Sequence, residues 1–180
     1  MLKFTIIACL NNKGVLGKDG DLLYHIPNDL SNFARATKYN GVVIMGRKTF
    51  GSLPNGEPLK GRINIIITNN QDYGIDVKFD NVYIVHSVAD AIELCEAFFS
   101  EKELFVIGGA SIYNAFMESQ MVDEMRLTVV DDDSEGDVFF PNFDEKDWYL
   151  YYKSLPQTCE DGNLKYAFCY KILKKIVTNE

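Results

Sequence analysis

Short apolar runs alternate with amphipathic stretches along the whole chain. Runs rich in Ile, Val and Leu are typical of buried strands, and they lie at residues 2–10, 42–45, 63–67, 82–85, 104–107 and 125–130. Helical spacing and capping residues between these runs predict helices. The predicted helices are one opened by Pro27, one over residues 48–53, one capped by Ser87 that reaches about Phe99, and one over residues 111–118. Two late runs, 148–154 and 164–172, flank a polar turn and predict a β-hairpin.

This alternation predicts an α/β fold with a mainly parallel central sheet of about eight strands and helices on both faces. The late hairpin would add antiparallel strands at one edge. The length fits a single domain over residues 1–180. Ligands of such sheets bind beyond the carboxyl ends of the strands. Three places therefore become candidates: the loop after Leu10, the segment 46–49 and the segment 108–111.

Charge and cysteine usage narrow the possible partners. The net charge of −8 argues against nucleic acid and against anionic membranes. The apolar N-terminal segment lacks a basic leader and a cleavage site, so we expect a cytoplasmic protein. No interface signal is evident, so a monomer is the default expectation. The cysteines are scattered, and we expect reduced, mostly buried thiols and no metal site. They are Cys9, Cys95, Cys159 and Cys169.

Two glycine-containing segments are candidates for binding anions. In Gly46-Arg47-Lys48-Thr49, two cations and a hydroxyl follow the end of a strand, which is typical of an anion site. A solvated basic loop is the alternative. In Gly108-Gly109-Ala110-Ser111, adjacent glycines allow a backbone to approach a pyrophosphate closely, although such a pair often marks only a tight turn. Two anion sites on one sheet edge suggest a ligand with several phosphates.

Asp29 and Phe33 form the third candidate feature. Asp29 lies in the first turn of a predicted helix, and Phe33 follows one turn later on the same face. A carboxylate in this position often does no more than complement the helix dipole. Beside an aromatic wall, however, it can hydrogen-bond a polar heteroaromatic ring that stacks on apolar surface.

Together these segments resemble those of dihydrofolate reductases, in the same order along about residues 4–172. The matching segments are Ile-Ile-Ala-Cys-Leu (6–10), Gly-Val-Leu-Gly (14–17), Ile-Pro-Asn-Asp-Leu-Ser-Asn-Phe (26–33), Val-Ile-Met-Gly-Arg-Lys-Thr-Phe (43–50), Pro-Leu-Lys-Gly-Arg-Ile-Asn (58–64), Val-Ile-Gly-Gly-Ala-Ser-Ile-Tyr (106–113) and Glu-Gly-Asp-Val-Phe-Phe-Pro (135–141). The resemblance implies NADPH-dependent reduction of 7,8-dihydrofolate to 5,6,7,8-tetrahydrofolate, by hydride transfer to C6 and protonation of N5. It also implies that antifolates bind.

On the substrate side, the resemblance implies that Asp29 is the catalytic carboxylate and binds the 2-amino group and N3 of the pterin. Thr128 would hydrogen-bond Asp29, and Arg62 would bind the carboxylate of the glutamate tail. The other residues would line the pterin, the benzoyl group or the nicotinamide end. The implied substrate-binding residues are Ile7, Cys9, Leu22, Tyr24, Asp29, Phe33, Leu53, Leu59, Arg62, Ile107, Tyr113 and Thr128.

On the cofactor side, the resemblance places Arg47 near the 2′-phosphate of NADPH and Lys48 with Thr49 at the pyrophosphate. His86 would lie by the adenine, and Gly108-Gly109 would form a cis peptide beside the cofactor. The implied cofactor-binding residues are Cys9, Val15, Leu16, Gly17, Lys18, Asp19, Gly46, Arg47, Lys48, Thr49, Thr68, Asn69, His86, Gly108, Gly109, Ala110, Ser111 and Ile112.

The resemblance makes residues 15–24 a lid, and the sequence departs from the family there. Leu23-Tyr24 stands in place of the usual Pro-Trp. We hypothesise that the Tyr24 hydroxyl holds the ordered water that the tryptophan usually holds; the alternative is that Tyr24 only packs the end of the lid. In the acidic stretch 131–137, Asp137 is the expected partner of the lid, whereas Asp132 and Asp133 have the pattern of a solvated turn.

Two other functions remain open at this point. Riboflavin-pathway reductases share the fold and the cofactor but reduce the ribose chain of a pyrimidinone, and they do not need an acid followed by Phe one turn later. A non-catalytic protein that binds NADPH or stores folate is the second alternative. Oxidation of NADPH upon addition of dihydrofolate would separate both from a dihydrofolate reductase.

Overall fold

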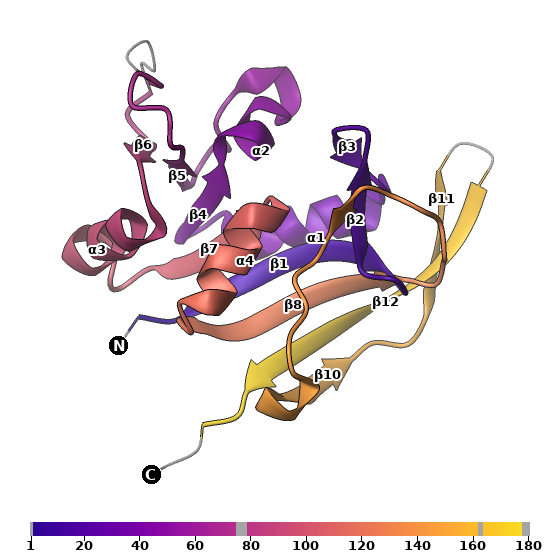
Figure 1. Cartoon of the computed structure of the whole chain (residues 1–180). Coiled ribbons are helices and arrows are strands. Elements are labelled where there is room, and N and C mark those ends of the chain that lie inside the picture. Colours follow the sequence, from indigo (N-terminus) through magenta and orange to yellow (C-terminus); the bar gives the residue numbers. More distant parts are fainter. Residues whose placement is uncertain (1, 75–78, 162–163, 178–180) are drawn as a thin grey trace.

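The computed structural model describes residues 2–74, 79–161 and 164–177 (Figure 1). In chain order the elements are β1 (Phe4–Asn11), β2 (Val15–Lys18), β3 (Asp21–Leu22), α1 (Pro27–Thr37), β4 (Gly41–Gly46), α2 (Arg47–Gly51), the 3-10 turn η1 (Pro54–Gly56), β5 (Ile63–Ile67), β6 (Val82–Val85), α3 (Val88–Phe98), β7 (Glu103–Gly108), α4 (Ala110–Glu118), β8 (Val122–Val130), β9 (Val138–Phe139), the 3-10 turn η2 (Glu145–Asp147), β10 (Trp148–Lys153), β11 (Gln157–Asp161) and β12 (Leu164–Lys175).

The central sheet has the strand order β10-β12-β8-β1-β7-β4-β5-β6, and β11 also pairs with β12. The strands from β8 to β6 run parallel to their neighbours. β12 is antiparallel to β8 and to β10. The mainly parallel sheet with an antiparallel edge is therefore confirmed. The parallel strands read as continuous apolar runs because helices cover both of their faces.

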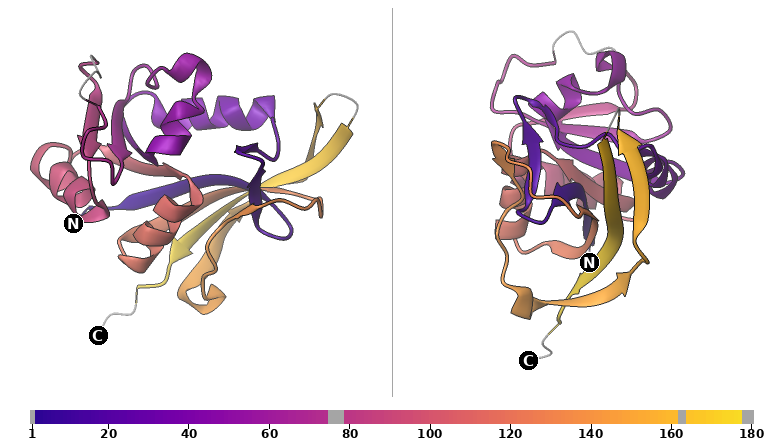
Figure 2. Two further views of the ribbon diagram at one scale, coloured as in Figure 1. Left: turned by 45° about the horizontal axis from the view of Figure 1, so that its top comes forward. Right: turned by 90° about the vertical axis from the view of Figure 1, so that its right-hand side faces the viewer.

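The helices lie on both faces of the sheet, as predicted. The left view of Figure 2 shows α1 and α4 on opposite sides of β1. Alternate residues of β1 therefore enter different cores. Phe4 and Ile6 pack with Phe116 of α4, whereas Ile7 packs with Phe105 and with residues near α2. No helix in the described part of the chain is both long and apolar enough to cross a membrane.

Two features depart from the expected elements. The glycine-rich stretch after Gly14 contains β2, which pairs with β3 and β9 in a separate three-stranded sheet. These strands are too short for a period-2 pattern to be visible in the sequence. The connection between the late strands contains β11, so β12 has a partner on both halves of its length.

Local sequence signals fix the helix starts that matter for the site. Pro27 occupies the first turn of α1, where its fixed φ suits a helix and its missing N–H has no cost. Asp29 follows in the same turn. Ser87 caps α3 by accepting a hydrogen bond from the backbone N–H of Asp90 (3.0 Å). The predicted helix over residues 48–53 is the shorter α2, which ends before Pro54.

Candidate active site

The two glycine-containing segments meet at the carboxyl ends of β4 and β7, as the sequence predicts. A Cβ atom on Gly109 would lie 3.3 Å from Oγ1 of Thr49, and one on Gly46 would lie 3.1 Å from Cγ1 of Ile112. Both glycines thus permit a close approach that larger residues would prevent. The Gly108–Gly109 peptide bond is cis, as the resemblance implies. Ala110, Ser111 and Ile112 form the first turn of α4 directly behind it.

Asp29 lies in the first turn of α1, where its carboxyl contacts β8. The hydroxyl of Thr128 on β8 donates a hydrogen bond to Oδ1 of Asp29, which confirms the predicted contact. Burial raises the pKa of Asp29, and the bond from Thr128 opposes that rise by favouring the carboxylate. The carboxyl therefore stays protonated to a higher pH than that of an exposed aspartate, which suits a group that binds a protonatable ring. Cys9, half-buried on β1, carries a thiol whose pKa is raised by burial and then by Asp29.

Tyr113 links α4 to β1 at the floor of the site. Its hydroxyl donates to the backbone carbonyl of Ile7 (2.7 Å), and burial raises its pKa. A Cβ atom on Gly108, whose φ is +113°, would lie 3.1 Å from this hydroxyl. Glycine is therefore required at position 108 on both conformational and steric grounds.

The outer wall of the site is formed by the segment between β4 and β5, together with residues of β7 and α1. Leu53, Leu59 and Ile107 pack against the core cluster that contains Phe50 and Phe105. At the outer end, the Cζ atom of Arg62 lies 5.8 Å from the centre of the Phe33 ring, and Arg62 donates to the hydroxyl of Thr37 (3.0 Å). These contacts fix a cation beside the aromatic wall, where it can receive an anionic group.

The predicted cofactor residues on α2, directly after β5 and directly after β6 form the other end. Nδ1 of His86 lies 2.9 Å from the carbonyl oxygen of Thr68. The guanidinium of Arg47 stacks over Tyr73, with Cζ 5.6 Å from the ring centre. The sequence reading missed Tyr73; the visible signal was a lone aromatic residue in the polar stretch after β5.

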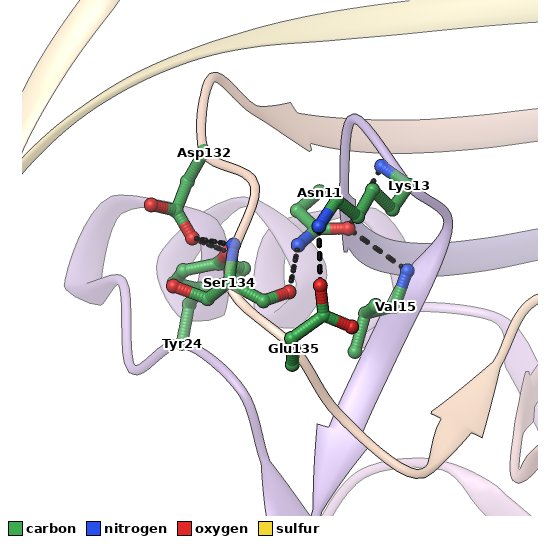
Figure 3. Close-up of polar contacts among 7 residues, drawn as sticks. All are labelled: Asn11, Lys13, Val15, Tyr24, Asp132, Ser134 and Glu135. Carbon is green, nitrogen blue, oxygen red and sulfur yellow. Dashed lines mark hydrogen bonds and ion pairs between the residues drawn. The ribbon is translucent and has the colours of Figure 1, made fainter.

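The lid is fastened to the loop before β9 by a network of polar contacts (Figure 3). Asn11, which is buried, accepts hydrogen bonds from the backbone of Lys13 and Val15 (3.0 Å each). It also donates to the carbonyl of Ser134 (2.9 Å). Lys13 and Glu135 form an exposed ion pair. Sequence reasoning missed Asn11, although a single Asn at the end of an apolar strand was the available signal.

Asp137 is a partner of the lid, as predicted. Its carboxylate accepts a hydrogen bond from the backbone N–H of Asp19 (3.2 Å), and its own N–H donates to the carbonyl of Gly17 (3.1 Å). The lid strand is thus held by backbone and side chain together. Val15 and Leu16 are buried within it, and Gly17 packs closely on Asp21.

The hypothesis for the Tyr24 hydroxyl is wrong. The hydroxyl donates to Oδ2 of Asp132 (2.5 Å), and the ring packs edge-on against Tyr166 (5.0 Å between centroids). Asp132 is therefore not simply a solvated turn residue, since its carboxylate accepts hydrogen bonds from Tyr24 and Ser134. These bonds lower the pKa of Asp132. A phenol reaches across to a carboxylate that lies 108 positions away in the sequence, and no local pattern reveals that pairing. Tyr24 therefore anchors the lid rather than presenting its hydroxyl to the substrate side.

Some of the predicted substrate- and cofactor-binding residues lie at the exposed margin of the candidate active site. The side chains of Leu22, Lys18, Asp19, Lys48 and Asn69 are exposed, so a ligand would have to cover them. None of the four cysteines forms a disulfide in the described part of the chain. Only Cys95 is fully buried, because the other three lie in strands with one partly open face.

The contact between Thr128 and Asp29 leads to a first prediction. Thr128→Val removes the hydrogen bond that favours the carboxylate, so the pKa of Asp29 should rise and the alkaline limb of the pH–activity profile should move to higher pH. The catalytic efficiency kcat/KM at neutral pH should nevertheless fall by roughly twofold to tenfold, because Asp29 loses the hydrogen bond that holds it in place. Steady-state rates between pH 5 and 9 test this. Thr128→Ser should restore the profile, and an unshifted limb in Thr128→Val would show that the hydroxyl does not act on Asp29.

Comparison with known proteins agrees with this geometry. A family model described as dihydrofolate reductase matches residues 3–175. The dihydrofolate reductase of Bacillus subtilis strain 168 is 34% identical over 171 residues, which are 95% of this chain and 94% of that protein. That of Staphylococcus haemolyticus is 33% identical over 97% of each chain. A solved structure of the enzyme from Enterococcus faecalis, complexed with NADP(H) and RAB-propyl, has a TM-score of 0.77 at 30% identity and covers 96% of each chain.

Proposed function

Because this chain belongs to the dihydrofolate reductase family, we infer that it reduces 7,8-dihydrofolate to 5,6,7,8-tetrahydrofolate with NADPH. The observation that carries this inference is the buried Asp29, held by Thr128, one helical turn from Phe33 and across the sheet edge from the two glycine segments. A pyrimidinone reductase of the same fold would have no use for this acid beside an aromatic wall, and the family match does not favour it.

The residues present fit the cofactor. The close approach of Gly46, Gly109 and Thr49 leaves backbone where a Cβ atom would otherwise stand, and this suits a pyrophosphate. Arg47 offers a guanidinium for the 2′-phosphate. We propose that the remaining contacts come from Lys48, Thr49, Thr68, Asn69, His86 and the first turn of α4. When bound, NADPH supplies the hydride that reduces C6 of the substrate.

We propose that Asp29 binds the 2-amino and N3 edge of the pterin. A carboxylate in a largely dry pocket forms charge-assisted hydrogen bonds to such an edge. Phe33, Leu53 and Leu59 would pack against the ring and the benzoyl group, and Arg62 would bind the carboxylate of the tail. Tyr113, tied to the carbonyl of Ile7, would hold the floor on which the two rings are aligned.

Proton delivery to N5 follows from the same arrangement. Among the described residues, Asp29 forms no hydrogen bond or ion pair with a lysine. The thiol of Cys9 has a pKa raised by burial, so it is a poor acid at neutral pH. We propose that Asp29 polarises the pterin edge while water delivers the proton to N5. Activity should then fall as pH rises above the pKa of Asp29.

The test is the decay of NADPH absorbance on addition of dihydrofolate to the purified chain. Turnover that requires both reactants supports the assignment. Saturable binding of either compound without turnover would instead favour a non-catalytic binding protein. Turnover of a ribosylated pyrimidinone, with none of dihydrofolate, would favour the riboflavin-pathway alternative.

Arg47 should determine the preference for NADPH over NADH. A guanidinium–phosphate contact contributes roughly 2 kcal/mol, so Arg47→Ala should raise the KM for NADPH by about 30-fold. The KM for NADH, which lacks the phosphate, should change little and serves as the internal control. If both constants rise equally, Arg47 acts only through its stacking on Tyr73, and the assignment of the phosphate site is wrong.

A further inference from the structure

A large cavity lies behind α1 and shares part of its wall with the proposed folate pocket. Its volume is about 770 Å³, and neither Leu53, Leu59 nor Tyr113 lines it. Its walls come from α1, β8, β10, β12 and the segment around β11. Its polar lining includes Asn28, Asn32, Arg35, Arg126, Thr128, Tyr152 and Tyr170. Ile7, Asp29 and Phe33 also line it, so the cavity reaches the carboxyl of Asp29.

The geometry of α1 explains how the cavity reaches Asp29. Asn28, Asn32 and Arg35 are spaced by four and three residues and therefore share one face of the helix. Asp29 lies at the edge of that face, next to the sheet. The lining is rich in polar groups, and a cavity of this size and polarity readily holds water.

Tyr170 stands beside Asp29 at the floor of this cavity. Tyr170 on β12 is the register partner of Thr128 on β8, so the two side chains are neighbours on one face of the sheet. Thr128 bonds directly to Asp29. Burial raises the pKa of Tyr170, and the charge of Asp29 raises it further.

The Tyr170 hydroxyl is buried and has no hydrogen-bond partner among the described residues. The side-chain amide of Asn32 lies close enough to oppose the rise in the Tyr170 pKa. A buried hydroxyl without a partner is costly, and buried polar groups in native proteins are almost always satisfied by protein or by water. Tyr170 also lines the adjoining cavity, so a small shift of its side chain would bring the buried hydroxyl to water held there.

We propose that the cavity behind α1 is a solvent channel to Asp29, and that Tyr170 is a positioning residue that holds water against the carboxyl. A proton then passes from this water to the free oxygen of Asp29, and the water regains one from bulk solvent. The reverse transfer follows the same path. Asp29 thus exchanges its proton with solvent without any opening of the lid. The inference builds on the proposed role of Asp29, but its test measures the carboxyl directly.

The groups that face Asp29 all have to be considered in such a titration. Tyr170 faces it from β12, Cys9 from β1, Tyr113 from α4, and Thr128 from β8. Arg35 and Arg126 line the same cavity. Of the groups named, Tyr170 is the one whose hydroxyl is both buried and unpaired, so its removal isolates the solvent contact.

The experiment is a 13C NMR titration of the Asp29 carboxyl in the ligand-free protein, with the resonance assigned by its absence in Asp29→Asn. Tyr170→Phe removes one hydroxyl and the water that it orders, so the carboxylate loses a hydrogen bond that favours its charged form. The pKa of Asp29 should rise by about 0.4 to 1 unit relative to the unmodified chain. The matched control is Tyr151→Phe, because Tyr151 stacks under Lys174 and does not line the cavity.

An Asp29 pKa that is unchanged or lowered in Tyr170→Phe overturns the proposal, and so does an equal rise in Tyr151→Phe. A change in thermal stability alone would mean that Tyr170 is structural and would also overturn it. Failure of the proposed function would appear separately, as absence of NADPH oxidation in the unmodified chain. The alkaline limb of kcat/KM in Tyr170→Phe should move in the same direction as the NMR titration.

Discussion

Asp29→Asn should lower kcat/KM for dihydrofolate by at least tenfold to a hundredfold at neutral pH. The amide preserves the shape of the side chain but cannot form charge-assisted hydrogen bonds to the amino-bearing edge of a pterin. Loss of such a bond in a dry pocket costs roughly 1.5–3 kcal/mol. The residual rate should fall further as pH rises, because solvent then supplies the proton alone. Steady-state and single-turnover measurements test this, and turnover like that of the unmodified chain would sink the assignment.

The stability of the same variant provides the control. The pKa of Asp29 is raised in the folded state, so the folded protein binds a proton more tightly than the unfolded chain does. As pH rises from the pKa of Asp29 in the unfolded chain to its raised pKa in the folded protein, ionisation of Asp29 lowers the free energy of unfolding. Above the folded-state pKa this loss of stability is constant. Asp29→Asn removes this loss. It should unfold at a temperature equal to or higher than that of the unmodified chain at pH 8, which would separate lost chemistry from lost folding.

Gly136→Ala should be the most damaging single change at the contact between the lid and the loop before β9. A Cβ atom on Gly136 would lie 2.3 Å from Cγ1 of Val15 and 2.5 Å from the carbonyl oxygen of Gly17. The carbonyl belongs to the backbone of β2, so the strand must move. Overpacking of this kind costs roughly 1–3 kcal/mol, and kcat/KM should fall by about tenfold as the lid leaves the site. Faster amide hydrogen exchange at residues 15–18 should accompany the loss.

Gly14→Ala is the matched control for that experiment. Gly14 lies in the turn between β1 and β2, directly before the lid. A Cβ atom there would meet nothing within 4 Å, although its φ of +77° strains an alanine. Its effect on kcat/KM should be distinctly smaller. Equal effects of the two substitutions would mean that backbone strain in the loop, rather than the contact between Gly136 and β2, controls the lid.

The central strands could be predicted from the sequence because their signal is local. The runs at 63–67 and 82–85 coincide with β5 and β6, since strands covered on both faces are apolar throughout. The glycine segments were also visible, because strand ends in a parallel sheet converge on one edge. Helical spacing alone was enough to pair Asp29 with Phe33.

What the sequence could not reveal depends on residues that are distant along the chain. Tyr24 meets Asp132, and Asn11 meets Ser134; either polar group could equally have faced solvent. Tyr170 sits in a strand whose alternation shows only that one face is inward. Neither its unpaired hydroxyl nor the cavity beside it exists until β12 pairs with β8 and α1 packs across them.

The position of β1 in the middle of the sheet has a consequence for the order of folding. β1 precedes every other described strand in the chain and lies between β7 and β8, so Phe4 must find Leu104 on one side and Val122 on the other. The long chain segments that separate β1 from β7 and β8 must close into loops before β1 gains its partners, which makes folding slow. A nascent chain that ends near residue 108 has β1 with one open edge, a surface prone to aggregation. The carboxyl of Asp29, which is synthesised before β8, stays without Thr128 until β8 has emerged.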